Sequence, residues 1–193
     1  IYKSKLEGII SEDEKLNMNK VSTSNLFNKR EKNVKILDSL IIDNNIYLTK
    51  SYELQNCKKL EIIFAEIKDK LKFKSFKKFK ECAVENLGAG RIQAFNFNGN
   101  DGILLSTTDS DNDKPGNKAQ DDNSIFGKIV FIDFNNRQHN NFSKGHRNVQ
   151  GLFVLNETIL STEHGPRGGD EINKIIFGKN YGWPIASYGY SYD

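Results

Sequence analysis

The chain has 193 residues and a mass of 22.0 kDa, with 37% hydrophobic and 27% charged residues. A chain of this length buries a core without the dense disulfides that miniproteins need. Its longest apolar runs, residues 40–42 and 62–65, are far shorter than the roughly 20 residues of a transmembrane helix. The composition therefore predicts a soluble globular protein with no membrane span.

The net charge of +3 is divided unevenly along the chain. Residues 1–80 carry 18 Lys and Arg against 11 Asp and Glu, whereas residues 81–193 carry 10 against 14. The densest basic stretch, residues 70–80, alternates lysine with phenylalanine and contains no arginine. Lysines on an exposed edge strand block aggregation between strands, and this explains the stretch better than nucleic-acid binding does.

Two further features of the chain leave alternatives open. Cys57 and Cys82 are 25 residues apart, and they are either a disulfide, a pair of buried thiols or unrelated. The chain begins at Ile1 and stops at Asp193 inside a turn-rich phrase, so we expect both ends to be cuts in a longer protein. The lack of a signal peptide therefore does not define the compartment.

The first 35 residues are polar and irregular. We interpret them as a loop-rich segment that leads into the folded domain, or as part of a preceding small sheet, which would be one blade of a propeller. Residues 36–193 are different, because short runs rich in Ile, Val, Phe and Tyr recur there between Asn, Gly and Asp clusters. Such runs predict an all-β chain of short strands. The expected strands are residues 46–49, 60–67, 71–79, 91–97, 102–107, 125–134, 151–155, 158–161 and 171–177.

One pair of these strands echoes another. Residues 92–95 and 103–109 read like residues 149–152 and 158–164, with a spacing of 57 residues between Gln93 and Gln150. A repeat of this length favours radial repetition of small sheets, as in a β-propeller, over a sandwich.

Residues 145–190 hold the densest set of candidate functional residues, including the single tryptophan, Trp183. Gly165 and Pro166, followed by two more glycines, allow backbone carbonyl oxygens to turn toward a ligand or a hard cation. Arg147 beside Asn148 offers a planar cationic fork next to an amide, which suits a carboxylate or a quinone oxygen.

These phrases resemble the soluble quinoprotein glucose/sorbosone dehydrogenase family, whose members use pyrroloquinoline quinone (PQQ) and calcium. The resemblance is strongest at residues 145–148, 163–173 and 180–184, with support from residues 119–120 and 127–130. It implies a six-bladed β-propeller, of which this chain would hold roughly three to four blades. It also implies a sugar substrate, a separate electron acceptor, and a periplasmic or extracellular location.

The resemblance assigns roles to individual positions. Arg147 and Asn148 match the pair that contacts the quinone, and Asp109 matches an acidic residue that supports the wall of the site. Gly165 and Pro166 match the pair whose carbonyl oxygens hold calcium. The resemblance thus predicts a PQQ and calcium site built from these five residues.

The family's general base departs from the pattern. It is a histidine in the phrase His-x-x-Gly-Arg, and here that phrase has leucine, Leu87, in its first position. Leucine accepts no proton, so two hypotheses remain: an aldose-oxidising enzyme, or a catalytically impaired propeller that acts as a binding or structural module. His146 and His164 lie inside phrases that the family already has, so neither is a specific replacement.

Overall fold

The computed structural model describes residues 22–83, 87–110 and 117–190. Strands dominate these ranges, and their one helical segment is the short 3-10 helix η1 (Asn117–Ala119). None of the helical structure in these ranges is long and apolar enough to cross a membrane.

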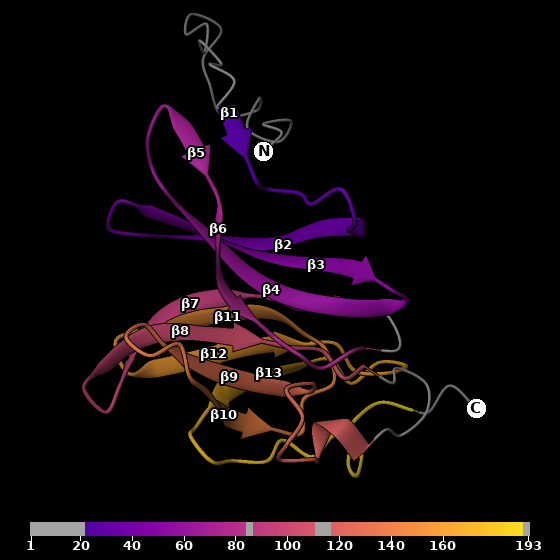
Figure 1. The fold of residues 1–193 in the computed structure, drawn as a ribbon. Helices are drawn as coiled ribbons and strands as arrows, with labels where there is room; N and C mark the ends of the chain where they lie inside the picture. Colours follow the sequence, from indigo (N-terminus) through magenta and orange to yellow (C-terminus); the bar gives the residue numbers. More distant parts are fainter. Residues whose placement is uncertain (1–21, 84–86, 111–116, 191–193) are drawn as a thin grey trace, which may run out of the picture.

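Three antiparallel sheets and one short parallel pair contain the strands (Figure 1). The first sheet has the order β2 (Lys32–Ile42), β3 (Asn45–Leu54), β4 (Cys57–Glu66) and β6 (Lys74–Lys78). The second has the order β7 (Ile92–Phe97), β8 (Asn100–Ser106), β9 (Lys128–Asp133) and β10 (His139–Lys144). The third consists of β11 (Val149–Leu155), β12 (Thr158–Glu163) and β13 (Glu171–Ile175). The parallel pair is β1 (Ser22–Ser24) with β5 (Lys70–Lys72).

Tight two-residue hairpins connect several of the consecutive strands. Asn98 and Gly99, between β7 and β8, have φ values of 52° and 81°. Gln55 and Asn56, between β3 and β4, have φ values of 52° and 59°. Two positive φ values in a two-residue loop suit the right-handed twist of the flanking strands, and asparagine and glycine adopt them at low cost. The polar clusters of the sequence thus become turns.

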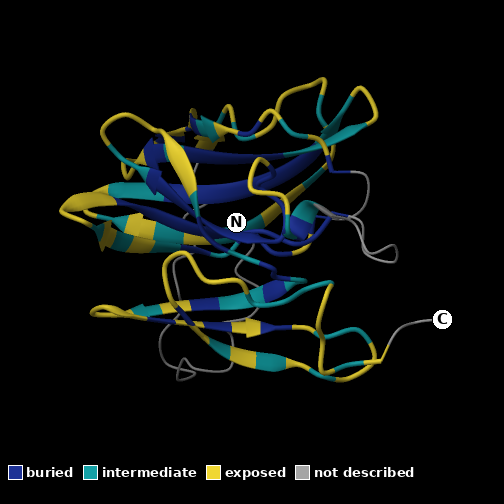
Figure 2. Cartoon of the chain, turned by 90° about the horizontal axis from the view of Figure 1, so that it is seen from below, coloured by how far each residue is buried: buried dark blue, intermediate teal, exposed yellow. Residues whose placement is uncertain are grey.

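The middle strands of the second sheet are buried on both faces. In β8, Ile103 and Leu105 belong to the apolar cluster shared with the first sheet. Leu104, between them, belongs to the cluster shared with the third sheet. Successive strand side chains point to opposite faces, so a continuous apolar run fills two interfaces at once. Figure 2 shows this as dark blue strands at the centre and yellow hairpin turns around them.

The first strands of the three sheets lie next to one another. Arg91, directly before β7, donates from Nη1 to the carbonyl oxygen of Leu37 in β2 (2.6 Å). Its Nε donates to the carbonyl oxygen of Gln150 in β11 (2.7 Å). The backbone NH of Ile92 donates to the carboxylate of Asp38 (2.9 Å). Three sheets joined through their first strands have the radial arrangement of propeller blades, as the repeat predicted.

The echo between two parts of the sequence corresponds to two equivalent hairpins. Gln93 lies in β7 and Gln150 in β11, and each strand opens its own sheet. The prediction of radially repeated sheets is therefore confirmed at the level of strand order.

Several strands differ from the sequence-based prediction, and the single strand expected at residues 71–79 is divided between β5 and β6. Strand β10 was not expected, because its sequence HNNFSK is polar and only its second half is buried. Strands β1 and β2 were not expected either, because the predicted strands begin at residue 46 and β2 starts at Lys32 inside the stretch interpreted as irregular. Strands β2 and β10 each lie at the edge of a sheet and pair with one neighbouring strand. This backbone pairing stabilises a strand whose composition carries no strand signal.

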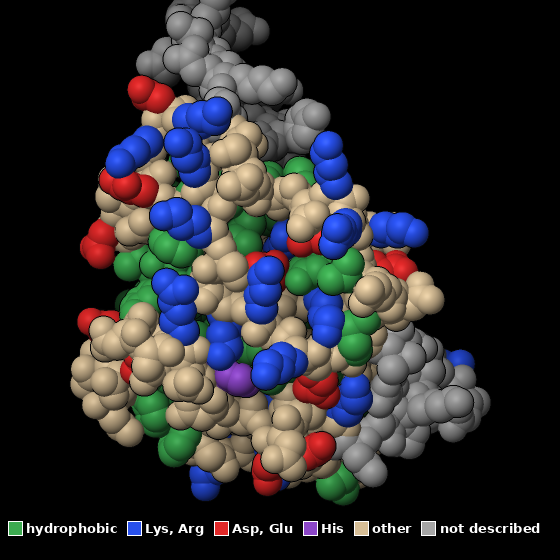
Figure 3. Space-filling model, viewed as in Figure 1, with side chains coloured by type: hydrophobic (Ala, Val, Ile, Leu, Met, Phe, Trp, Pro, Cys, Tyr) green, Lys and Arg blue, Asp and Glu red, His purple; other side chains and the backbone are tan. Residues whose placement is uncertain are grey.

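The basic stretch lies where the sequence placed it. Strand β6 is the outermost strand of the first sheet, and Lys74 and Lys78 on it are exposed. Lysine and arginine side chains are scattered widely over the face of the molecule that Figure 3 shows. Charged side chains on an edge strand oppose pairing with another chain, which explains the composition of this stretch.

The two outer sheets differ in how their outward faces are covered. On the first sheet, Leu48 and Ile63 pack with Leu71 and Phe73, which come from the segment around β5. On the third sheet, large apolar side chains are exposed instead. These are Phe153, Leu155, Leu160 and Ile172. In a closed propeller the next blade covers such a face.

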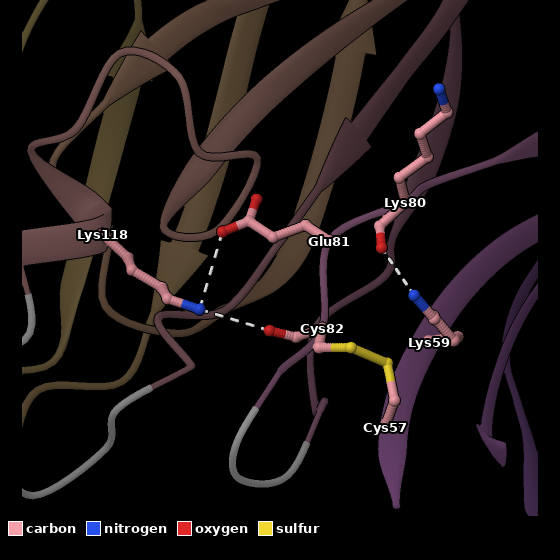
Figure 4. The surroundings of a disulfide bond; sticks show 6 residues. All are labelled: Cys57, Lys59, Lys80, Glu81, Cys82 and Lys118. Carbon is pink, nitrogen blue, oxygen red and sulfur yellow. Dashed lines mark hydrogen bonds and ion pairs between the residues drawn. A yellow bond between two sulfur atoms is a disulfide. The ribbon is translucent and has the colours of Figure 1, made fainter. Parts of the chain in front are cut away.

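Cys57 and Cys82 form a disulfide, which resolves the alternatives left by the sequence (Figure 4). Cys57 begins β4, and Cys82 lies in the segment that leads from the first sheet to the second. Neighbouring Glu81 accepts hydrogen bonds from Ser124 Oγ (2.8 Å) and from the backbone NH of Ile125 (2.9 Å). The disulfide and Glu81 together fix this connection against both sheets.

We expect the double substitution Cys57→Ser/Cys82→Ser to lower the free energy of unfolding by about 3 kcal/mol, because the closed loop no longer restricts the unfolded chain. Urea unfolding measured by circular dichroism checks the value. Reduction of the unsubstituted protein serves as the control and should reproduce the loss. A double variant as stable as the oxidised protein would contradict the prediction.

Candidate functional site

Three loops meet at one end of the second and third sheets. They are residues 107–110 after β8, residues 145–148 before β11 and residues 164–170 after β12. The backbone NH of Asp109 donates to the carbonyl oxygen of Arg147 (2.8 Å). The backbone NH of His164 donates to the carbonyl oxygen of Asn148 (3.0 Å). Residues far apart in sequence are thus joined through their main chains.

Arg147 connects two of these loops through its side chain. Its Nη1 donates to the carbonyl oxygen of Gly165 (2.7 Å) and to that of His164 (3.1 Å). The guanidinium carbon lies 5.2 Å from the ring centre of Trp183, within the range of a cation–π interaction. The cationic group is therefore held in a defined direction.

Asp109 holds the indole ring of Trp183 against which the Arg147 guanidinium lies. It is completely buried, and its Oδ2 accepts a hydrogen bond from the indole Nε1 of Trp183 (2.7 Å). The side chain of Gln120 also donates to the carbonyl oxygen of Trp183. Asp109 thus fixes the ring on which Arg147 rests. The wall-supporting role that the resemblance implied for Asp109 stays a prediction.

Asn148 lies beside Arg147 and contacts Gln150, a residue that borders an open groove. Its Oδ1 accepts a hydrogen bond from Gln150 Nε2 (2.7 Å). The groove has a volume of about 320 Å³ and is bordered by Gln150, Thr162, Glu163, His164, Asp170, Glu171 and Ile172. Its size falls within the range of small-molecule sites.

The loop that begins at Gly165 is closely packed. A Cβ atom at Gly165 would overlap with the carbonyl oxygen of Gly168, so only glycine fits. The backbone NH of Gly165 donates to Asp170 Oδ1 (3.0 Å). Pro166 follows and lies against Gly189. This packing fixes the loop that carries the two carbonyl oxygens expected to hold a cation.

The carboxylate of Asp170 closes the same loop. The hydrogen bond from the backbone NH of Gly165 is the main cause that lowers the pKa of Asp170, followed by the hydrogen bond from His164. Asp170 Oδ2 lies 3.3 Å from His164 Nδ1, and both side chains are exposed. Hydrogen bonds to the charged form therefore keep this carboxylate ionised.

Carboxylate and imidazole clusters do not form a metal centre in the described ranges. No group of three or more His, Cys, Asp or Glu side chains in that part of the chain lies close enough to hold an ion. A hard cation at this site would instead use backbone carbonyl oxygens, as the glycine-rich loop predicted.

Leu87 lies near the site but faces away from it. Its side chain is buried in the apolar cluster between the first and second sheets. The next residue, Gly88, is close to the site, since a Cβ there would lie 3.6 Å from Asn148 Oδ1. With this backbone, a histidine at position 87 would point into the core.

Two of the three histidines, His146 and His164, lie near the site in different surroundings. His146 is completely buried, with Nε2 2.8 Å from Ser143 Oγ and Nδ1 3.0 Å from Glu163 Oε2. These contacts have the order of a hydrolase triad, but Ser143 is only 3% exposed, so no substrate reaches it. His164 is exposed and paired with Asp170.

Lys128 fixes the loop that carries Gln120. The Lys128 ammonium donates to the carbonyl oxygens of Lys118 (2.6 Å), Ala119 (3.1 Å) and Phe126 (2.8 Å). Burial, the largest cause, lowers the pKa of Lys128 to about 8. The loop that carries Gln120, which contacts Trp183, is therefore held by hydrogen bonds to the buried amino group of Lys128.

We expect the free energy of unfolding to rise between about pH 8 and pH 10, because Lys128 loses its proton earlier in the folded chain than in the unfolded chain. The rise should reach at most about 3 kcal/mol. Thermal or urea unfolding across this pH range checks it against Lys128→Met. An equal rise in both proteins would show that Lys128 is not its source.

Comparison with known proteins identifies the family. The model of the family "Glucose / Sorbosone dehydrogenase" matches residues 33–193, which is most of the chain. The chain belongs to this family. The resemblance predicted from residues 145–148, 163–173 and 180–184 is therefore confirmed.

Two curated relatives show how far the similarity to the glucose/sorbosone dehydrogenases extends. An aldose sugar dehydrogenase of Escherichia coli K12 is 34% identical over 132 residues, which cover 61% of this chain and 34% of that protein. Quinoprotein glucose dehydrogenase B of Acinetobacter calcoaceticus is 51% identical over 57 residues, or 26% of this chain and 12% of that one.

Solved structures of the glucose/sorbosone dehydrogenases confirm the fold. The E. coli aldose sugar dehydrogenase in its apo form has a TM-score of 0.65 and 26% identity, covering 77% of this chain and 47% of that chain. The PQQ-bound aldose sugar dehydrogenase of Streptomyces coelicolor has a TM-score of 0.56 and 24% identity, a likeness of fold alone. It covers 79% of this chain and 47% of that chain. The chain thus corresponds to about half of each solved relative.

Within this glucose/sorbosone dehydrogenase fold, four of the five residues assigned from sequence come together at Arg147, and the fifth, Pro166, follows Gly165 in the chain. Asp109 and Gly165 both reach Arg147, and Asn148 adjoins it in the chain. Sequence reasoning missed two residues of the same region. Trp183 was given no role of its own within the candidate region, although its ring lies against the guanidinium. Glu163 was read only as part of a phrase, although its carboxylate accepts the backbone NH of Arg147.

Proposed function

We propose that this member of the glucose/sorbosone dehydrogenase family binds PQQ and a calcium ion at the site around Arg147 and oxidises an aldose sugar at carbon 1. The observation that supports this proposal most directly is the hydrogen bond from the Arg147 guanidinium to the Gly165 carbonyl oxygen (2.7 Å). It brings the donor expected for the quinone next to the oxygen expected for the cation.

The residues present fit such a cofactor. PQQ is an anionic quinone, and Arg147 beside Asn148 supplies a fixed cation and an amide. Both side chains contact residues that border the open groove, since Arg147 donates to the carbonyl oxygen of His164 and Asn148 accepts from Gln150. The carbonyl oxygens of Gly165 and Pro166 are the hard, neutral ligands that calcium accepts. The close packing of Gly165 against Gly168 pre-organises this loop.

The chemistry divides between cofactor and protein. When bound, PQQ would accept the hydride from carbon 1 of the sugar, and the proton of the carbon 1 hydroxyl would pass to water, because Leu87 accepts none. Arg147 would place positive charge beside the site where negative charge develops, and its contacts to Gly165 and Trp183 hold it there. Asp109 would maintain this direction through Trp183 without touching the substrate.

The named relatives support the choice of an aldose as substrate. The E. coli relative is an aldose sugar dehydrogenase, and the Acinetobacter relative is a quinoprotein glucose dehydrogenase. A dehydrogenase reaction of this kind also needs an electron acceptor, as a second partner, to reoxidise the reduced cofactor. We infer that the same substrate class and partner class apply to this chain.

A second candidate function follows from Leu87. Its buried leucine side chain supplies no base, and loss of a general base costs about 10²–10⁴ in rate. The alternative is a propeller of the same family that binds PQQ or a partner without turnover.

We also propose a periplasmic or extracellular location. The disulfide between Cys57 and Cys82 supports it, because disulfides persist in oxidising compartments. Cell fractionation followed by immunodetection tests this proposal, and protein found in the cytosolic fraction with reduced thiols would contradict it.

The two candidate functions are separated by one experiment on protein expressed from its complete gene. The protein is loaded with PQQ and calcium, and reduction of an artificial dye by glucose is measured beside PQQ binding. Glucose-dependent dye reduction supports the dehydrogenase. Binding of PQQ without reduction of the dye by any aldose favours the module, and absence of PQQ binding overturns the proposed cofactor.

A further inference from the structure

Glu163 is a buried carboxylate whose contacts converge on the backbone of the site. It ends β12 and is 6% exposed. Its Oε1 accepts hydrogen bonds from the backbone NH of Arg147 and from that of Asn148 (3.3 Å). The carboxylate therefore binds the main chain of the two residues expected to contact the quinone, not their side chains.

The remaining backbone groups of these two residues are also bound. The carbonyl oxygen of Arg147 accepts from the NH of Asp109 (2.8 Å), and that of Asn148 accepts from the NH of His164 (3.0 Å). With its NH groups held by Glu163, this dipeptide is restrained on both sides. The direction of a side chain follows from the orientation of its backbone, so the restraint extends to the guanidinium and the amide.

The other carboxylate oxygen of Glu163 contacts the side chain of His146, which is itself held by Ser143 and Tyr181. His146 Nδ1 lies 3.0 Å from Glu163 Oε2, and His146 Nε2 lies 2.8 Å from Ser143 Oγ. Tyr181 stacks on the imidazole with a centroid distance of 4.6 Å. This buried chain of contacts leaves Glu163 little freedom.

We propose that Glu163 is a positioning residue for cofactor binding: it holds the Arg147–Asn148 backbone so that both side chains face the quinone, and His146 fixes its carboxylate. The role rests on the proposed function. Buried NH groups that lose their acceptor are costly, so without Glu163 this turn would change conformation to reach other acceptors or water.

The test compares Glu163→Ala and the near-isosteric Glu163→Gln with the unsubstituted protein. PQQ affinity, measured by fluorescence titration with calcium present, should fall at least about tenfold in Glu163→Ala. In Glu163→Gln it should fall only about threefold, because the amide oxygen still accepts both NH groups. The matched control is Glu61→Gln, a carboxylate that is 2% exposed and bound to Lys50 in the first sheet. It should lower stability but leave PQQ affinity unchanged.

A second readout needs no cofactor. Amide hydrogen exchange of Arg147 and Asn148 in the cofactor-free protein should be at least about tenfold faster in Glu163→Ala, with the amides of β3 unchanged. Unchanged exchange or unchanged PQQ affinity in Glu163→Ala would overturn the proposal, as would an equal loss of affinity in Glu61→Gln. If the unsubstituted protein binds no PQQ, the proposed function fails and the role toward the quinone with it. The exchange result then still decides whether Glu163 holds this turn.

Discussion

Replacing Arg147 with alanine is expected to lower the affinity for PQQ by about 10–100-fold, the range for loss of a hydrogen bond to a charged group. The same substitution should raise the affinity of the cofactor-free protein for calcium. The reason is that the guanidinium now occupies the carbonyl oxygens of Gly165 and His164, at 2.7 and 3.1 Å. A cation bound to the Gly165 oxygen would have to share it with this positive charge.

Calorimetric titration with calcium alone, and with PQQ in the presence of calcium, measures both effects. Arg137→Ala is the matched control, because Arg137 lies over Phe64 and Phe76, away from the site. Both affinities should stay unchanged in this control. An Arg147→Ala protein that binds PQQ as tightly as the unsubstituted protein would show that Arg147 does not contact the quinone.

The second large effect is expected on stability. Arg91→Met should lower the free energy of unfolding by about 3–5 kcal/mol, since backbone carbonyl oxygens of two other sheets lose their charged donor. Those carbonyls belong to Leu37 and Gln150. Methionine keeps much of the length and the apolar part of the side chain, so the loss reports the hydrogen bonds rather than a cavity.

Chemical unfolding checks this value, with Arg30→Met as the control because Arg30 is exposed. The control should change stability by less than about 0.5 kcal/mol. An equally small change in Arg91→Met would contradict the view that Arg91 joins the first strands of the three sheets.

Much of the fold could be predicted because its central strands are short apolar runs that end at asparagine and glycine turns. Strand β8 illustrates this, since Ile103, Leu104 and Leu105 form an apolar run that fills two interfaces. Strand β10 could not be predicted, because its histidine and asparagines carry no strand signal and its pairing with β9 decides its conformation. Cys57 and Cys82 could not be paired from spacing alone, because pairing depends on how β4 approaches a distant loop.

The site could be predicted in part for a related reason. Arg147, Asn148 and Gly165 lie in phrases whose chemistry is visible in the sequence, and the structure brings Arg147 and Gly165 into contact. The role of Glu163 was not visible, because it acts through backbone NH groups that have no sequence signature. Leu87 was correctly read as a residue that accepts no proton, but its burial in the core required the structure.

The most direct test of the site is a crystal structure of the protein, expressed from its complete gene, with PQQ and calcium. We predict that the quinone contacts the side chains of Arg147 and Asn148, and that calcium binds the carbonyl oxygens of Gly165 and Pro166. A structure at saturating cofactor in which PQQ lies elsewhere, or in which these residues contact only protein and water, would contradict the assignment.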